Sequence, residues 1–166
     1  MPPGQPLRMI CKAHPDLNAA VRGDEVVLVR ADPSDKYQDW IHDYDNVGRV
    51  TDQQGRRAFA LVNVATGKAL VHHREELQLA DYTGHDRVEI SKLWSLGVQF
   101  DDGFCEIRNV NDTTSTINVQ ERRGKEPKVG LFRYSRKTEG IYDYTVWKIV
   151  PITSESDPQV SVRQNS

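Results

Sequence analysis

The sequence has few cysteines, no long apolar run and no excess of charge of either sign, and each absence removes a class of protein. Cys11 and Cys105 stand far apart and form neither a CxxC pair nor a zinc-ligand spacing. We expect two reduced, partly buried thiols. No apolar stretch approaches the ~20 residues of a membrane helix, so we expect no membrane association. The 22 basic and 24 acidic residues leave a net charge of -2, which predicts no nucleic-acid partner.

Neither end of the chain contains an apolar run. The first six residues contain three prolines and no apolar core of a secretory signal, so we expect no signal peptide and a flexible N-terminus over residues 1–6. Residues 153–166 are small and polar, which predicts a disordered C-terminal tail.

The 3.6-residue periodicity of an amphipathic helix is also missing, and short apolar runs separated by turn residues take its place. The three tryptophans, Trp40, Trp94 and Trp147, follow one another at nearly equal intervals. Comparable short strands precede each of them: Val26–Val29, Leu77–Leu79 and Val129–Phe132. The sequence therefore predicts an all-β chain built from a threefold repeat.

Such a repeat favours a β-trefoil, because equivalent apolar positions from three units meet on one axis and one unit alone cannot bury its apolar face. The predicted units are about 7–52, 53–101 and 102–152, which together form one domain over residues 7–152. We assign the three tryptophans to the core, because burying an indole removes a large apolar area from water.

Several stretches resemble a known family. Gln38-Asp39-Trp40 matches the Gln-x-Trp signature of ricin-B-type trefoils, and the segment from Leu61 to Leu70 is similar to the opening strand pair of a ricin-B repeat. The wider pattern resembles the Euonymus-lectin family of plants, as in Cys11–Asn18 and Ala31–Gln38. The resemblance covers about residues 8–152 and is weaker in the third unit.

This resemblance implies a β-trefoil with three ricin-B-like repeats that binds mannose- or galactose-containing glycans and glycoproteins, without enzyme activity or cofactor. It also implies residence in the cytoplasm and nucleus and a link to stress responses. A carbohydrate site in such a trefoil combines a stacking aromatic ring, a carboxylate just after the second strand and an Asn-Gln pair before the tryptophan.

The first two units depart from that pattern. In the first, Asp24 is displaced by one position from the carboxylate place, and Arg30 stands where an aromatic residue is expected. In the second, Val71 and His72 leave no carboxylate, although Tyr82 remains as a stacking candidate.

The third unit carries the predicted carbohydrate site. We assign it to Asn118, Gln120, Phe132, Tyr134 and Asp143. Gln120 falls where an aspartate is expected, and Tyr144-Thr145 replaces the Asn-Gln pair. The alternative is that Phe132 and Tyr134 only pack the barrel, and that a trefoil without sugar binding serves as a protein-interaction module.

Other chemistry finds little support in the sequence. His72 and His73 are adjacent on a predicted strand and point to opposite faces, so they cannot readily share a metal ion. No phosphate-binding loop and no nucleophile motif is present. We therefore expect neither catalytic residues nor a metal site.

Overall fold

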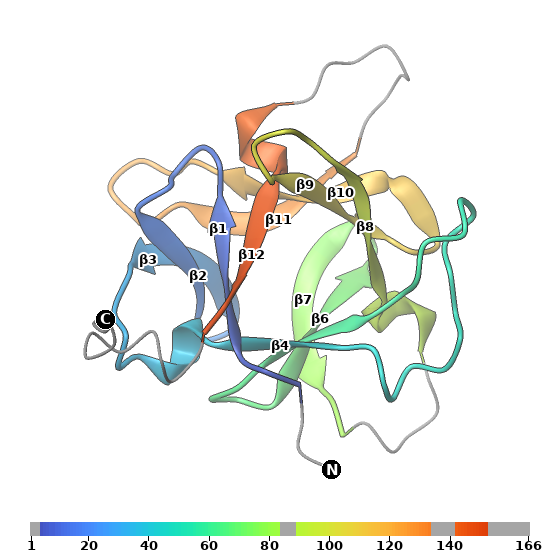
Figure 1. Cartoon of the computed structure of the whole chain (residues 1–166). Coiled ribbons are helices and arrows are strands. Elements are labelled where there is room, and N and C mark those ends of the chain that lie inside the picture. The colour runs from blue at the N-terminus through green and yellow to red at the C-terminus, as the bar shows by residue number, and fades with distance from the viewer. Residues whose placement is uncertain (1–3, 84–88, 134–141, 153–166) are drawn as a thin grey trace, which may run out of the picture.

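A computed structural model describes residues 4–83, 89–133 and 142–152. Tyr134 and the predicted C-terminal tail lie outside these residues, as do residues 1–3. The described residues form strands and three short 3-10 helices, and Figure 1 shows how the strands are arranged. The first two units contain β1 (Leu7–Cys11), β2 (Leu17–Arg22), β3 (Glu25–Arg30), η1 (Lys36–Gln38), β4 (Trp40–Asp43), β5 (Ala60–Asn63), β6 (Lys68–His73), β7 (Glu76–Asp81), η2 (Ile90–Lys92) and β8 (Trp94–Gln99). The third contains β9 (Cys105–Asn109), β10 (Asp112–Gln120), β11 (Lys128–Arg133), η3 (Asp143–Thr145) and β12 (Trp147–Pro151).

Each unit contributes two strands to a central barrel and two to an outer hairpin. Antiparallel pairing joins β1 with β4 and β12, β4 with β5, and β9 with both β8 and β12. A bridge between Phe59 and Trp94 closes the ring. The β2–β3, β6–β7 and β10–β11 hairpins each pair through six residues. In Figure 1 the blue β1 lies beside the red β12, so the two ends of the domain meet. The predicted β-trefoil is confirmed.

The three tryptophans hold the same place in each unit. All three are completely buried. Each indole Nε1 donates to a carbonyl on the second strand of its own unit, at Ala19 (3.0 Å), Leu70 (3.1 Å) and Ile117 (2.8 Å). Their assignment to the core is therefore confirmed, and the hydrogen bonds define equivalent positions in the three units.

The two cysteines are free and buried. Cys11 packs in the main core beside Trp147, its partner across the β1–β12 ladder. Burial raises the pKa of Cys11 to about 11, so the thiol stays protonated at neutral pH.

A second apolar cluster lies under the segment that joins β4 to β5, residues 44–59. Its buried members are Val47, Ala58, Ala60, Leu93 and Val110. Within the described residues, no helix is long and apolar enough to cross a membrane, and no group of three or more metal-ligating side chains comes together.

Candidate functional site

The tryptophan hydrogen bonds define equivalent positions on the second strand of each unit. The residue after the bonded carbonyl is Ala20 in the first unit, Val71 in the second and Asn118 in the third. Only the third unit places a polar side chain there. Because side chains alternate along a strand, Asn118 points away from the core-facing Ile117 and Val119.

The Asn118 amide is buried, and one of its two polar atoms lacks a hydrogen bond within the described residues. The side chain is 5% exposed, and its Oδ1 has no hydrogen-bond partner among the described residues. A buried acceptor left unpaired costs about 1–3 kcal/mol, so an unmet acceptor of this kind is uncommon in a folded domain. Its place on the hairpin makes it a candidate acceptor for a ligand hydroxyl.

A glycine opens the space opposite Asn118. Gly130 pairs with Asn118 across the β10–β11 ladder, and the amide of Gln120 lies over the glycine backbone. A Cβ atom at residue 130 would come 2.6 Å from Gln120 Nε2. Gln120 therefore reaches across the same face of the hairpin that Asn118 occupies, at a place where only a glycine leaves room for it.

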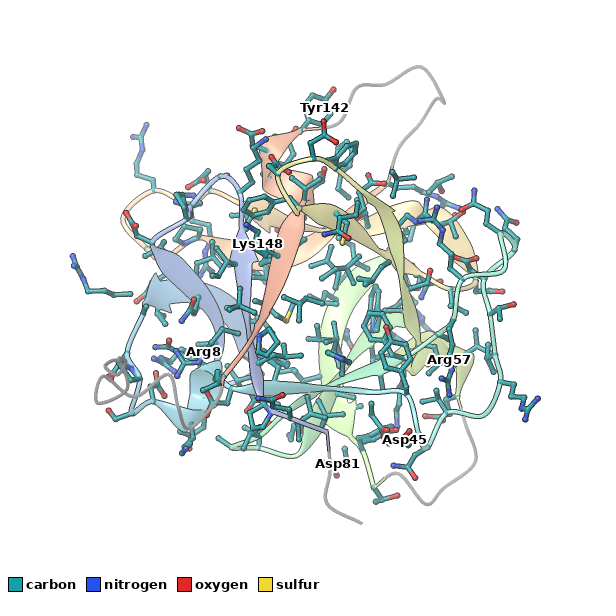
Figure 2. The ribbon with its side chains drawn as sticks, in the orientation of Figure 1. Arg8, Asp45, Arg57, Asp81, Tyr142 and Lys148 are labelled. Atoms are coloured by element: carbon teal, nitrogen blue, oxygen red, sulfur yellow. The ribbon has the colours of Figure 1, made fainter. Side chains whose placement is uncertain are left out.

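Three aromatic rings, which we call the aromatic cluster, gather at this side of the third unit. The Phe132 ring meets Tyr142 and Tyr144 edge-on, with centroids 6.0 and 6.2 Å apart. The two tyrosine rings stack with their centroids 5.1 Å apart. Because η3 packs on β10, the cluster lies next to the strand that carries Asn118. Tyr142 is exposed and stands at the edge of the molecule in Figure 2.

Asp143 faces away from this hairpin. Its carboxylate lies 3.9 Å from Lys12 Nζ, and Lys12 pairs with Asp102 at 2.7 Å. Asp143 lines a cavity of about 630 Å³ with Lys12, Phe100 and Tyr142. Asn118, Gln120 and Phe132 do not line it. The structure therefore brings together Asn118, Gln120 and Phe132 and separates Asp143 from them, while Tyr134 lies outside the described residues.

The sequence patterns did not single out Tyr142 and Gly130. Tyr142 and Tyr144 are aromatic residues on either side of the predicted site residue Asp143. A glycine inside the apolar run of β11 is a signal of close approach. Both signals were available, but neither shows by itself which neighbour the residue meets.

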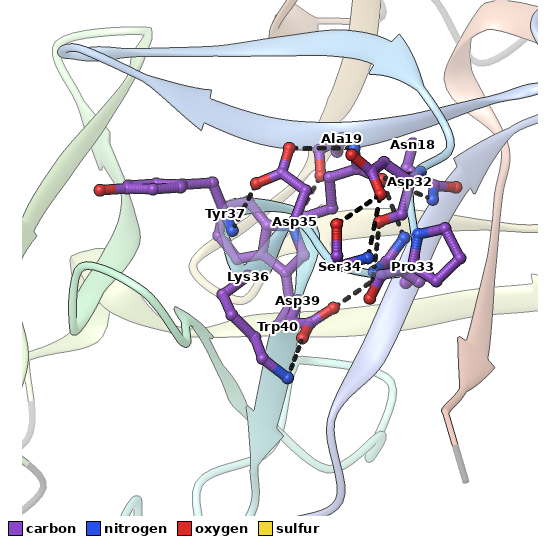
Figure 3. A network of polar contacts seen from close by, with 12 residues as sticks. Asn18, Ala19, Asp32, Pro33, Ser34, Asp35, Lys36, Tyr37, Asp39 and Trp40 are labelled. Carbon is purple, nitrogen blue, oxygen red and sulfur yellow. Dashed lines mark hydrogen bonds and ion pairs between the residues drawn. The ribbon is translucent and has the colours of Figure 1, made fainter. Parts of the chain in front are cut away.

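In the first unit Gln38 is engaged within the protein, next to the polar contacts of Asp35 and Asp39 that Figure 3 shows beside Trp40. Gln38 is 1% exposed, and its Oε1 accepts from Arg8 Nη1 at 2.8 Å and from the Asp32 backbone N–H at 3.2 Å. Its Nε2 donates to the Arg30 carbonyl at 3.1 Å and to Asp35 Oδ2 at 3.0 Å. The glutamine of the Gln-x-Trp signature is thus a structural residue here.

In the second unit the stacking candidate is partly buried and bonded within the protein. Tyr82 donates its hydroxyl hydrogen to Asp43 Oδ2 at 2.6 Å and packs against the apolar cluster under residues 44–59. Although burial alone would raise the pKa of Asp43, hydrogen bonds from Tyr82 and Asn46 lower it. Lys92, at the position of Gln38, donates to the Asp81 carbonyl at 2.9 Å. Among the described residues at these equivalent strand positions, only Asn118 of the third unit is polar and keeps an unpaired atom.

Comparisons with known proteins agree with the repeat and the fold. No protein-family model matches the chain. It is 34% identical over 153 residues to the ricin B-like lectin EULS3 of Arabidopsis thaliana, which covers 87% of this chain and 47% of that protein. It is 36% identical over 115 residues to the ricin B-like lectin R40G3 of Oryza sativa subsp. japonica, covering 68% and 56%. The chain thus spans about half the length of the curated relatives it matches.

A solved structure supports the fold. The BEL β-trefoil aligns with a TM-score of 0.63 at 14% identity, covering 92% of this chain and 96% of that one. Fold and relatives together define a β-trefoil of the ricin-B type. The chain is similar over most of its length to ricin B-like lectins of plants.

Proposed function

We propose that the chain binds carbohydrate, without catalysis, through the β10–β11 face of its third unit. The observation that carries this proposal is the unpaired, buried Oδ1 of Asn118. A sugar hydroxyl is a donor of the right size for it, and the aromatic cluster offers apolar ring surface for the C–H face of a pyranose. The names of the relatives, which are ricin B-like lectins, point to the same class of ligand.

The roles of the residues differ. Asn118 accepts from a ligand hydroxyl, Gln120 offers a second polar group, and Phe132 holds the tyrosines that form the stacking surface. Tyr134 follows Phe132 by two residues and is proposed to extend this surface. Asp143 is proposed to contact only a ligand long enough to reach the neighbouring cavity.

An array of mannose- and galactose-containing glycans, followed by calorimetry with the best binder, tests the proposal. Asn118→Ala and Phe132→Ala should each weaken binding about tenfold or more, since a lost hydrogen bond or stacking contact is worth roughly 1–2 kcal/mol. The matched control is Tyr37→Ala, which removes the exposed tyrosine of η1 at the place that Tyr144 holds in η3. Absence of binding above background, or equal loss in the control, contradicts the proposal.

A second candidate is a protein-interaction module. The observation that favours it is the apolar surface at the β8–β9 turn, where Val98 is 58% and Phe100 is 40% exposed. Val98→Ser with Phe100→Ser should abolish capture of a protein partner and leave binding of a monosaccharide, which is too short to reach the Asp143 cavity, unchanged. Such capture without any glycan binding would favour this second function.

We also propose residence in the cytoplasm and nucleus, because two free cysteines suit a reducing compartment. Imaging of a fluorescent fusion in plant cells tests this, and accumulation in the secretory pathway would contradict it.

A further inference from the structure

A cavity separates the outer hairpins of the second and third units. Its volume is about 540 Å³, within the range of small-molecule sites. The β6–β7 hairpin and η2 form one wall, and the β9–β10 turn and β11 form the other. The lining residues that matter below are His72, Glu75, Ile90, Asn109, Leu131 and Arg133. None of the proposed third-unit site residues lines this cavity.

Asn109 occupies a position at which the side chains of the other two units donate hydrogen bonds to backbone carbonyls. Cys11, Asn63 and Asn109 each stand opposite a tryptophan in the barrel ladders. Asn63 Nδ2 donates to the Tyr37 carbonyl at 2.9 Å. Cys11 Sγ donates to the Asp143 carbonyl at 3.3 Å.

In the third unit the side-chain donor at this position has no acceptor among the described residues. Asn109 is 2% exposed, and within the described residues its Nδ2 has no hydrogen-bond partner. Its Oδ1 accepts from the backbone N–H groups of Asn111 at 3.0 Å and Asp112 at 3.1 Å. These two bonds fix the amide orientation, so the unpaired donor cannot be an amide rotated by half a turn. Asn109 Nδ2 is thus a donor of fixed orientation in the wall of the cavity, without an acceptor among the described residues. An acceptor atom of a bound ligand would satisfy it.

The charges in the cavity are paired with one another. Arg133 lies 2.6 Å from Asp112 Oδ2 and 3.2 Å from Glu75 Oε2. Arg74 and Glu75 turn the β6–β7 hairpin in the left-handed region, with φ of 51° and 66°, which directs Glu75 toward β11. One guanidinium between two carboxylates favours neither an anion nor a cation strongly. A neutral ligand with many hydroxyl groups fits such walls, and Ile90 and Leu131 supply apolar surface for its carbon skeleton.

We propose that this cavity is a second carbohydrate site, distinct from the third-unit face, in which Asn109 Nδ2 donates to a ring or hydroxyl oxygen of a neutral saccharide. It extends the proposed function, because one trefoil then presents two saccharide sites on different elements. Two sites on one chain allow a branched glycan to be held at both.

Heteronuclear NMR titration of the full chain with methyl α-mannoside and with lactose tests this. The Asn109 side-chain amide signals should shift on saturation with one of the two sugars. Ile90→Trp fills the cavity from its exposed wall without touching a buried hydrogen bond, and should weaken that response about tenfold or more. Asn109→Asp keeps the acceptor of the turn and removes the donor together with its own amide signals, so the sugar-induced shifts of the adjacent Asn111 and Asp112 backbone amides should weaken similarly. Asn63→Asp, at the equivalent satisfied position, is the matched control.

The outcomes separate the two sites. Shifts at Asn118 without shifts at Asn109 leave the proposed function standing and overturn this one. Shifts at Asn109 that survive Ile90→Trp also overturn it. Inorganic phosphate serves as the anionic probe, and a response to phosphate with none to either sugar would show an anion site and contradict the saccharide proposal.

Discussion

The first and third units share a backbone plan and differ in what they do with their polar side chains. Each anchors its tryptophan to the second strand by the same hydrogen bond. In the first unit Gln38 is bonded at both ends of its amide, while in the third Asn118 keeps an unpaired acceptor. A family signature can thus persist as architecture in one repeat, while the repeat that we propose to bind carbohydrate has lost that signature.

The largest expected effect tests what the two units share. Trp40→Ala and Trp147→Ala should each lower the free energy of unfolding by about 3–5 kcal/mol, because both remove a fully buried indole. Urea denaturation followed by circular dichroism measures this. A much smaller loss in one unit would show that the two anchors are not equivalent.

A smaller effect separates the units by stability. Gln38→Ala should cost about 1–3 kcal/mol, because it leaves buried partners such as Asp35 and the Arg30 carbonyl with a lost bond. Glycan affinity measured by calorimetry should stay at the wild-type value. Loss of affinity without loss of stability would place recognition in the first unit instead.

The converse is expected in the third unit. Asn118→Ala should change the free energy of unfolding by less than about 1 kcal/mol, since the loss of packing is offset by removal of an unpaired acceptor. Thermal and urea denaturation of the free protein measure this. A destabilisation as large as that of Gln38→Ala would mean that Asn118 is a structural residue as well.

The smallest effect concerns Cys11, which stands in the first unit where Asn109 stands in the third. Because burial raises the pKa of Cys11 to about 11, its thiolate is scarce at pH 8 and sheltered from solvent. Labelling with a thiol reagent should leave Cys11 unmodified in the folded protein, as peptide mass spectrometry would show. Rapid labelling without urea would contradict its place in the core.

The repeat, the trefoil and the core role of the tryptophans could be predicted from the sequence, because spacing and apolar pattern are local properties. The grouping of Asn118, Gln120 and Phe132 on one face could also be predicted, since strand alternation dictates it. The direction of Asp143 could not, because its place beside Lys12 depends on β1, which is distant in sequence. The partial burial of Tyr82 likewise depends on Asp43 and Val47, which belong to the first unit.

Because β1 pairs with β12, the first and third units are joined in the barrel as closely as units that follow one another in the sequence. The fold therefore does not depend on which unit comes first in the chain. The Ile152 N–H donates to the Pro6 carbonyl at 2.8 Å, and Gln5 Nε2 donates to the Ile152 carbonyl at 2.8 Å. The ring of strands therefore has no free edge at this seam. A chain that is linked here and reopened at the exposed turn around Gly124 should fold to the same trefoil, with its third unit divided between the new ends.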